Sequence, residues 1–168
     1  MNERKESTTS IILEYVRVIV LTVIATFIFL QFVQISRVNG SSMENTYFQN
    51  NIVLIDKVFY KHSQPKRNDI IIVDYDDGLD DTLIIKRVIA VGGDHLDIKN
   101  NEVYINGKKI KESYIKENMN TEDLSIDIPK GKVFVMGDNR NHSLDSRKLG
   151  YFDFDNVVIG KVFFKIPL

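Results

Sequence analysis

The sequence predicts a mainly β fold, an antiparallel β-sheet or barrel-like domain carried by a single N-terminal transmembrane helix. Two observations predict this fold. An uncharged apolar run occupies residues 18–36, and the apolar residues after it come in short, β-branched runs separated by turn residues. With 168 residues, the chain has room for one such domain and little room for a second.

The apolar run is long enough to cross a membrane as a helix. Its 19 residues lie between Arg17 and Arg37. At about 1.5 Å per residue they reach roughly 28 Å, close to a hydrocarbon thickness of about 30 Å. Buried helices of soluble proteins are usually shorter and have a polar face. A cleaved signal peptide would end at small residues, whereas this run ends at Gln34-Ile35-Ser36, so we expect an uncleaved signal anchor.

The chain thus divides into an N-terminal segment of residues 1–17, the anchor of residues 18–36 and one domain of residues 37–168. Cationic residues on the two sides of the anchor are nearly balanced, so the positive-inside rule does not set its orientation. They are Arg4, Lys5 and Arg17 before the anchor, and Arg37, Lys57 and Lys61 after it.

Short apolar runs predict the strands of the domain, because each has strand length and most are rich in β-branched residues. Turn sequences separate them, and Asn-Asn and Asn-Gly pairs within residues 96–110 predict a meander with tight turns. Residues 113–125 have only a weak pattern, and either a loop or a short helix fits them. The runs are residues 52–55, 70–73, 83–85, 88–91, 133–136 and 157–159.

Composition excludes several classes of chemistry. Lys plus Arg number 22 against 23 Asp plus Glu, so the chain lacks the basic excess that binds nucleic acid, and no nucleic-acid partner is expected. Cysteine is absent, which excludes thiolate nucleophiles, disulfides and cysteine-ligated metals. Any catalytic group must therefore be an oxygen or a nitrogen group.

A serine-containing turn follows the anchor at Asn39-Gly40-Ser41-Ser42-Met43. It begins three residues beyond the apolar run, which would place a serine near the membrane surface. Gly-Ser-Ser by itself indicates only a turn, because a serine needs a nearby base to act as a nucleophile.

Lys86 is the strongest candidate for that base. If residues 83–90 form a strand, Lys86 shares one face with Ile84, Val88 and Ala90. Burial on an apolar face lowers the pKa of a lysine and yields the neutral amine that a general base requires. The alternative is a lysine at a strand end whose amine extends to solvent.

Residues 137–150 are mostly polar, charged or glycine, although they follow an apolar strand. Alternating Asp and Arg residues fit a partly buried, hydrogen-bonded scaffold, and a solvated surface loop fits them equally well. The residues alone leave both interpretations open.

Taken together, these three stretches closely resemble bacterial type I signal peptidases of the short Gram-positive type, which are membrane-bound serine–lysine endopeptidases. The resemblance covers nearly the whole chain. It is carried by Gly40-Ser41-Ser42-Met43 with Thr46, by Asp69-Ile70-Ile71, by Lys86-Arg87-Val88-Ile89 with Gly93-Asp94, and by Gly137-Asp138-Asn139-Arg140 with Ser143, Asp145-Ser146-Arg147 and Gly150.

The resemblance implies that Ser42 is the nucleophile, Lys86 the general base and Ser143 the hydroxyl that orients the lysine amine. It implies removal of N-terminal signal peptides from exported preproteins through an acyl-enzyme, without a metal or an organic cofactor. Gly40 and Met43 belong to the nucleophile motif. The supporting ion pairs would come from Asp138, Asp145, Arg87 and Arg147.

The resemblance also implies a location. It places residues 1–17 in the cytoplasm and residues 37–168 on the outer face of the cell membrane, with the anchor between them. The implied partners are exported preproteins, the lipid bilayer and the secretion machinery that delivers substrates. The substrate would lie as an extended strand beside the sheet, with small side chains selected near the cut.

Several positions depart from the common pattern of these peptidases. Asn45 stands where many members have proline, Tyr47 where leucine is usual, Ala90 for a glycine and Gly92 for a proline. These positions flank the motifs, so they affect loop rigidity more than chemistry. Gly40 lacks the serine hydroxyl that helps to stabilise the oxyanion in some relatives, which leaves the Ser42 backbone amide and an unidentified second donor.

Other groups of residues in the sequence give weaker evidence for a catalytic or metal site. His142, Ser143 and Asp145 are the residue types of a triad, but neighbours along one loop rarely reach triad geometry. The three histidines lack metal-ligand spacing. Residues 74–81 are acidic, but their glycine does not fit an EF-hand loop, and an acidic hairpin tip explains them better.

Two other functions compete with signal-peptide removal. A non-catalytic, membrane-anchored paralogue would bind leader-like peptides without cutting them, but the chain retains both Ser42 and Lys86. A self-cleaving, repressor-like protease would use the same chemistry, but the membrane run and the absence of a DNA-binding segment argue against it.

Overall fold

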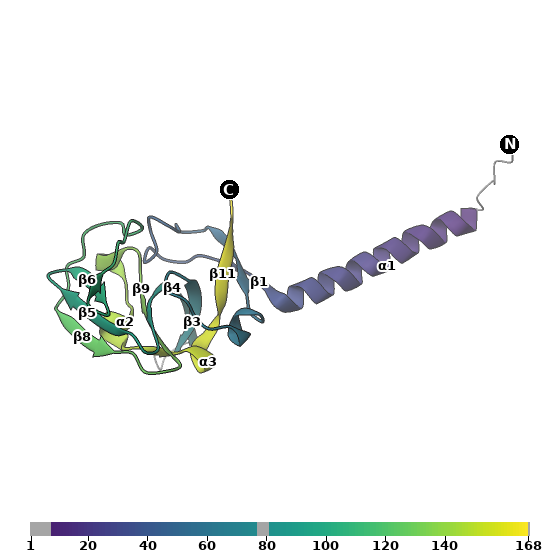
Figure 1. Cartoon of the computed structure of the whole chain (residues 1–168). Helices are drawn as coiled ribbons and strands as arrows, with labels where there is room; N and C mark the ends of the chain where they lie inside the picture. The colour runs from purple at the N-terminus through teal and green to yellow at the C-terminus, as the bar shows by residue number, and fades with distance from the viewer. Residues whose placement is uncertain (1–7, 77–80, 168) are drawn as a thin grey trace.

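The computed structural model describes residues 8–76 and 81–167, which form a β domain with one long projecting helix (Figure 1). Helix α1 (Thr8–Phe32) has no buried residue, and its length and composition would allow it to cross a membrane. The predicted acidic hairpin tip of residues 74–81 lies partly outside the described residues.

The helix does not coincide with the apolar run of residues 18–36. It begins at Thr8 and ends at Phe32, because Val33–Arg37 form strand β1. Strand β1 pairs antiparallel with β2 (Ile52–Asp56), and Val33 is buried. Sheet pairing and burial therefore outweigh the helical continuation that hydropathy predicts for residues 33–36.

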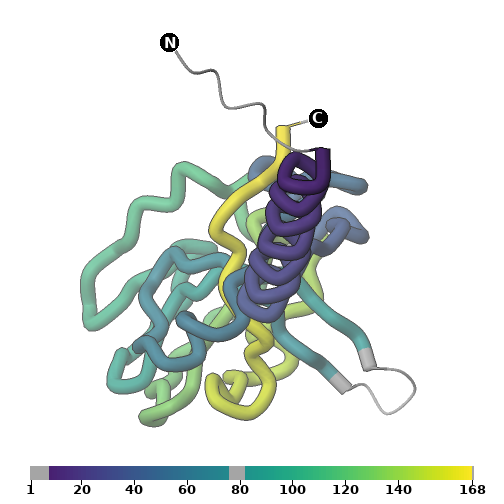
Figure 2. The backbone as a smooth tube through the Cα atoms, turned by 90° about the vertical axis from the view of Figure 1, so that its right-hand side faces the viewer, coloured from purple at the N-terminus to yellow at the C-terminus, as the bar shows by residue number. Residues whose placement is uncertain are grey.

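The main sheet has seven strands in the order β1-β2-β11-β3-β4-β9-β10, and all neighbouring pairs are antiparallel. The predicted antiparallel β fold is therefore confirmed. The described ends of β3 and β4 project from the body of the domain (Figure 2). The bounds of the further strands are β3 Ile70–Asp76, β4 Asp81–Val91, β9 Lys132–Met136, β10 Phe152–Asp153 and β11 Val158–Ile166.

A smaller sheet of four strands has the order β7-β6-β5-β8 and contains the predicted meander. Residues 112–123 run as an irregular loop up to β8, so the loop interpretation holds there rather than the helix. The bounds are β5 His95–Lys99, β6 Glu102–Ile105, β7 Lys108–Lys109 and β8 Leu124–Asp127, and the short helices are η1 Tyr60–His62, η2 Arg140–His142, α2 Ser146–Leu149 and α3 Phe154–Val157.

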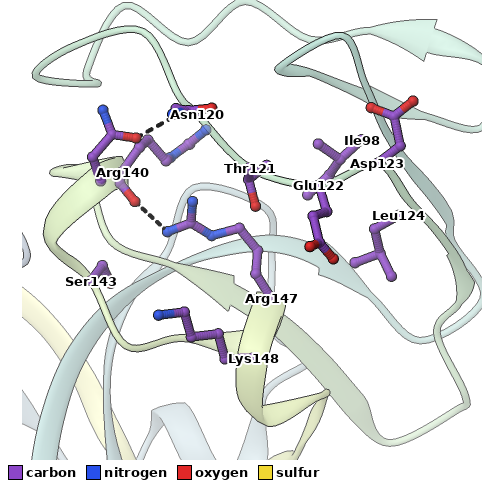
Figure 3. Close-up of a pocket in the computed structure, with 11 residues that line it drawn as sticks. Ile98, Asn120, Thr121, Glu122, Asp123, Leu124, Arg140, Ser143, Arg147 and Lys148 are labelled. Atoms are coloured by element: carbon purple, nitrogen blue, oxygen red, sulfur yellow. Dashed lines mark hydrogen bonds between the residues drawn. The ribbon is translucent and has the colours of Figure 1, made fainter.

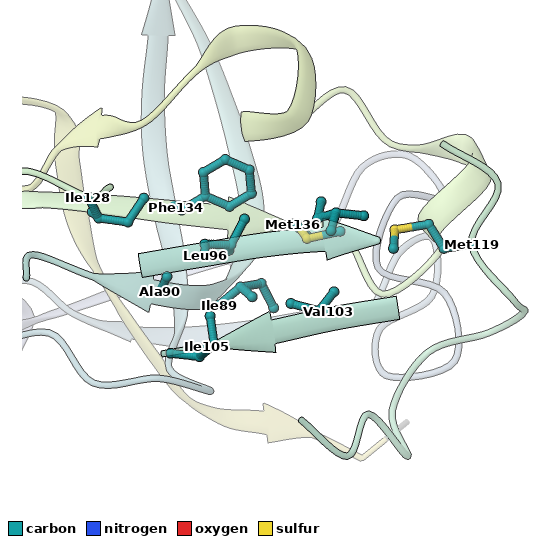
Figure 4. Close-up of a cluster of buried hydrophobic side chains, with 10 residues drawn as sticks. Ile89, Ala90, Leu96, Val103, Ile105, Met119, Ile128, Phe134 and Met136 are labelled. Atoms are coloured by element: carbon teal, nitrogen blue, oxygen red, sulfur yellow. The ribbon is translucent and has the colours of Figure 1, made fainter. Parts of the chain in front are cut away.

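A buried apolar cluster joins the small sheet to strands β4 and β9 of the main sheet (Figure 4). Its side chains come from both sheets and from the loops before and after β8, so burying them fixes the small sheet against the main one. The members are Ile89, Ala90, Leu96, Ile98, Val103, Ile105, Met119, Ile128, Phe134 and Met136.

Packing around Lys86 follows the predicted strand alternation as far as Val88. Ile84 and Val88 pack in one cluster and Ile85 in another. The pairing of β4 with β9 then shifts register between Val88 and Ala90, and Ala90 packs into the cluster between the sheets. The predicted shared face of Lys86 and Ala90 is wrong because of this irregularity.

Candidate active site

The predicted nucleophile Ser42 begins the turn of residues 42–46, which we name the nucleophile turn. The N–H groups of Thr46 and Tyr47 donate to the Met43 carbonyl at 3.0 and 2.8 Å. The Met43 side chain is 1% exposed and packs among apolar residues of the main sheet. Met43 therefore anchors the turn in the core, and Ser42 is left half-buried.

The predicted base Lys86 lies on β4 and is 3% exposed. Its Nζ is 2.8 Å from Ser42 Oγ and 2.9 Å from the Ile85 carbonyl oxygen. Burial lowers the pKa of Lys86 to about 8, against the opposing effect of the negative charge on Asp145. The amine therefore loses its proton far more readily than a solvent-exposed lysine.

Ser143 follows η2 and lies beside the nucleophile turn. A Cβ atom added to Gly137 would collide with both Ser143 Oγ and the Ser42 carbonyl oxygen, so these two oxygens flank Gly137. Ser143 Oγ is buried and makes no hydrogen bond of ordinary geometry with the described residues, although it lies close enough to Asp145 to help lower the pKa of that carboxyl. The structure thus brings Ser143 near Ser42 without a hydrogen bond to Lys86.

Asp138 joins the base strand to the nucleophile turn. Arg87 Nε and Nη2 donate to the two carboxylate oxygens of Asp138 at 2.8 and 2.6 Å. The Thr46 hydroxyl donates to the same carboxylate. Arg87 and Asp138 side chains are 9% and 0% exposed, so this is a buried, charge-assisted pair.

Asp145 and Arg147 form a second buried pair. Arg147 Nε and Nη2 donate to the Asp145 carboxylate at 2.8 Å each, and the Gly137 N–H donates to it at 3.0 Å. Burial disfavours the charged carboxylate, but the bonds and charge of Arg147 outweigh this effect and hold the pKa of Asp145 below its ordinary value. Asp145 is therefore ionised, and its charge acts on Lys86.

Residues 137–147 are a hydrogen-bonded scaffold rather than a solvated loop, since Asp138, Asn139, Arg140 and Asp145 are at most 1% exposed. The Asn139 N–H donates to the Ser42 carbonyl at 3.0 Å, and Asn139 Nδ2 donates to the Ser41 carbonyl at 3.0 Å. The scaffold is thus bonded directly to the backbone carbonyls on both sides of the Ser42 Cα atom.

Glu112 and Tyr114 also belong to the site, although no motif in the sequence marks them. Arg140 Nη1 and Nη2 donate to Glu112 at 2.9 and 2.6 Å, and the Tyr114 hydroxyl donates to Glu112 at 2.9 Å. The Arg87 guanidinium lies 3.9 Å from the centre of the Tyr114 ring. No local pattern could mark Glu112, because its partner Arg140 lies 28 positions later in the chain.

The structure explains three of the positions at which the sequence departs from the common pattern of the peptidases that it resembles. Asn45 has φ of 90°, a conformation closed to proline. Gly40 also has φ of 90°, and its N–H donates to Gln49 Oε1 at 2.6 Å. At Gly92, a Cβ atom would collide with the backbone at Pro129 and Lys130, so this backbone has no room for a larger residue.

The described part of the chain contains neither a triad of His142, Ser143 and Asp145 nor a cluster of metal ligands. No hydrogen bond there joins His142 to Ser143 or Asp145, and Asp145 is paired with Arg147. His142 is exposed. The described residues contain no group of three or more His, Asp or Glu side chains that could hold a metal ion.

Two cavities adjoin the site. A polar cavity of about 440 Å³ has Ser143, Arg147 and Lys148 on one side and Thr121 and Glu122 on the other (Figure 3). A smaller cavity of about 210 Å³ lies along the strand residues that precede Ser42 and Lys86. Its lining includes Val38, Asn39, Ile72, Leu83 and Ile85.

The family model described as "Signal peptidase, peptidase S26" matches residues 12–166. The chain belongs to this signal peptidase family. Signal peptidase I P of Bacillus subtilis subsp. natto is 32% identical, with 94% of this chain and 91% of that protein covered. Signal peptidase I S of Bacillus subtilis strain 168 is 34% identical, with 90% and 88% covered.

A solved signal peptidase I from Enterococcus faecalis V583 resembles the structure. The match has a TM-score of 0.52 and 28% identity, and it covers 60% of this chain and 98% of that one. The predicted family is therefore confirmed, and membership supports a peptidase that removes signal peptides. The helix α1 fits a membrane anchor of such a signal peptidase.

Proposed function

We propose that this signal peptidase is a membrane-anchored endopeptidase that cuts N-terminal signal peptides from exported preproteins, with Ser42 as nucleophile and Lys86 as general base. The observation that carries the proposal is the 2.8 Å contact between Lys86 Nζ and Ser42 Oγ. An amine that is buried, with a pKa of about 8, can accept the serine proton in neutral to alkaline solution.

The reaction then has two stages. Neutral Lys86 Nζ takes the Ser42 proton while Oγ attacks the scissile carbonyl carbon, and the ammonium then donates that proton to the leaving amine. The mature chain departs, and the signal peptide remains on Ser42 as an ester. Water deprotonated by the same amine hydrolyses the ester and restores Ser42. These steps need no metal and no organic cofactor.

The backbone around Ser42 is suited to stabilising the oxyanion. The Ser42 carbonyl is fixed by the Asn139 N–H, and no backbone hydrogen bond among the described residues uses the Ser42 N–H. We propose this N–H as one oxyanion donor. Gly40 contributes no hydroxyl, so the second donor must come from elsewhere.

The supporting residues keep the two reacting groups together. Asp138 binds both Arg87 beside Lys86 and Thr46 of the nucleophile turn, and Asp145 is held by Arg147. Ser143 is proposed to orient the lysine amine, because its buried hydroxyl lies near the Ser42 carbonyl and makes no hydrogen bond of ordinary geometry with the described residues.

The proposed substrate is an extended peptide that lies along the strand residues leading to Ser42 and Lys86. The cavity of about 210 Å³ beside Val38 and Ile85 is small and partly apolar, which suits the small side chains found near signal-peptide cleavage sites. Signal-peptide-bearing preproteins are the proposed partners, delivered at the bilayer by the secretion machinery.

The proposed topology places the N-terminal residues before the apolar run in the cytoplasm and the apolar residues of α1 up to Phe32 in the cell membrane. The peptidase domain, which begins with strand β1 at Val33, lies outside. The exposed apolar surface of α1, with no buried residue, supports a membrane-embedded anchor. Protease protection of intact cells tests the orientation, because only an extracytoplasmic domain is digested from outside.

Cleavage of a model preprotein by the detergent-solubilised full chain tests the chemistry. We expect Ser42→Ala and Lys86→Met to abolish cleavage while folding normally, and His142→Ala to cut like the wild type. An acid-quenched reaction should yield protein carrying the mass of the signal peptide as an ester. Full activity of folded Ser42→Ala, or a folded wild type that binds leader peptides but cuts none, would overturn the proposal.

A further inference from the structure

The irregular loop of residues 112–119, which we name the bridging segment, runs from the small sheet into the candidate site. Met119 at its end is 3% exposed and packs in the cluster between the two sheets. The segment is therefore anchored in the core at one end, while Glu112, Tyr114 and Lys116 contact the site.

Two residues of the nucleophile turn are bound by the bridging segment. Asn45 Nδ2 donates to the carbonyl oxygens of Tyr114 at 3.0 Å and Ile115 at 3.3 Å. Lys116 Nζ lies 2.6 Å from the carboxylate of Glu44. The turn is thus held from outside as well as by Met43.

The same segment is bound to the rest of the site. The Lys116 N–H donates to the Asp138 carbonyl at 2.9 Å, and the Tyr114 ring lies against the Arg87 guanidinium. Glu112 accepts two hydrogen bonds from Arg140, whose side chain is 0% exposed. One short loop therefore contacts the nucleophile turn, the base strand and the buried scaffold.

Asn45 is the residue that makes the connection to the turn. Its φ of 90° is tolerated by Asn and excludes proline, so no proline ring can stiffen the turn at this position. The two hydrogen bonds from its amide constrain the turn from outside. A displacement of the turn by about 1 Å would break the contact between Ser42 and Lys86, and misplacement of this size can lower a rate by about 10²-fold.

We propose that Asn45 and Glu44 are positioning residues, which hold Ser42 Oγ within reach of Lys86 Nζ through their contacts with the bridging segment. The inference rests on the proposed function, because it concerns the placement of Ser42 as the nucleophile. Neither residue touches the reacting atoms, so their effect falls on kcat rather than on substrate affinity.

The first test is Asn45→Gly, which keeps the positive φ and removes the amide. We expect kcat to fall about 10-fold, as for the loss of two ordinary hydrogen bonds, with KM within twofold of the wild type. Asn45→Asp should lose more, because its carboxylate would face the Tyr114 and Ile115 carbonyl oxygens. Wild-type kcat for folded Asn45→Gly would overturn the role of Asn45.

The second test reverses the Glu44–Lys116 ion pair and does not depend on Asn45. Glu44→Lys and Lys116→Glu should each lower kcat about 3-fold, the size expected of a partly exposed pair, and the double variant should recover to within twofold of the wild type. A matched control is Lys109→Glu, whose exposed partner Glu102 lies on the small sheet, and it should leave kcat unchanged. No recovery in the double variant would overturn the role of Glu44.

Ser42→Ala assayed in parallel separates the two proposals. If Ser42→Ala still cuts the preprotein, the proposed function fails. If Ser42→Ala is inactive while Asn45→Gly and both charge reversals match the wild type, the proposed function stands and the positioning role alone fails.

Discussion

Ile71 of β3 stands directly opposite Lys86 of β4 in the antiparallel register, and Ile71 is fully buried. Residues that face each other across such a pair share one face of the sheet, so an isoleucine shields the base of the lysine side chain from water. The sheet itself therefore disfavours the ammonium form of Lys86, before any residue of the buried scaffold is considered.

This burial predicts the pH dependence of cleavage. Because the pKa of Lys86 is lowered to about 8, the fraction of neutral amine rises as the pH increases through that value. We expect kcat/KM to rise about 10-fold per pH unit below pH 8 and to level off above it. Initial rates at fixed ionic strength measure this, and a profile that is flat from pH 6 to 10 would contradict a lysine base.

The same shift predicts that replacing Lys86 raises stability although it abolishes activity. Below pH 8 the folded protein bears the full cost of a buried ammonium, and this cost declines between pH 8 and the ordinary lysine value of 10.5. Lys86→Met should therefore unfold with a free energy up to about 3 kcal/mol higher than the wild type at pH 7. The difference should shrink as the pH rises toward 10.5, and urea unfolding at both pH values checks it. A gap that widens with pH would contradict the assignment.

The buried pair of Arg87 and Asp138 predicts a large loss on removing one partner. Asp138→Asn leaves the Arg87 guanidinium, 9% exposed, without a counter-charge. We expect the free energy of unfolding to fall by about 3–5 kcal/mol, measured by urea denaturation. Lys109→Ala, which breaks an exposed pair with Glu102, should cost less than about 1 kcal/mol and serves as the control. Equal losses in the two variants would contradict the importance of burial.

The close packing around Gly137 predicts that a larger residue at this position lowers the catalytic rate. A Cβ atom there would collide with Ser143 Oγ and the Ser42 carbonyl, so Gly137→Ala must shift the nucleophile turn. We expect kcat to fall about 10²-fold in protein that still folds. Gly160→Ala is a matched control, because its Cβ would collide with the Asp56 backbone on β2 instead. It should lower thermal stability and leave the kcat of folded protein unchanged.

Ser143→Ala tests the proposed orienting hydroxyl. Since Ser143 Oγ makes no hydrogen bond of ordinary geometry with the described residues, its removal should cost little stability. We expect kcat to fall about 10-fold or more with KM unchanged, while the thermal midpoint moves by less than about 2 °C. Unchanged kcat would show that Lys86 needs no help from Ser143.

Much of the fold could be predicted from sequence because it follows from local pattern. β-branched runs give the strands, and Asn-Gly gives the meander. Other features depend on distant partners. Residues 33–36 are apolar enough for a helix, and only pairing with β2 makes them a strand. The register shift after Val88 is likewise a property of the pair with β9.

The candidate site likewise contains residues that the sequence could indicate and residues whose roles depend on distant partners. Lys86 could be singled out because a lysine on an apolar strand face is a candidate base, whereas Ser42 could be assigned only through the resemblance to signal peptidases. Glu112 and Asn45 could not be assigned a role, because their partners, Arg140 and the backbone carbonyls of residues 114 and 115, are set by how the small sheet packs. Backbone acceptors leave no mark in a sequence at all.

The passage from α1 into β1 contains no intervening residue. Phe32 ends the helix and Val33 starts the strand, the Lys57 N–H donates to the Phe32 carbonyl at 3.2 Å, and the Phe32 and Phe59 rings stack with centroids 5.4 Å apart. With no linker residue and with these two contacts, the joint between helix and strand has little freedom to bend. In a bilayer, the domain of the proposed enzyme would rotate together with its anchor, and Ser42 would stay at a fixed distance from the lipid surface. The distance of a peptide bond from that surface would then help to determine which bond is cut.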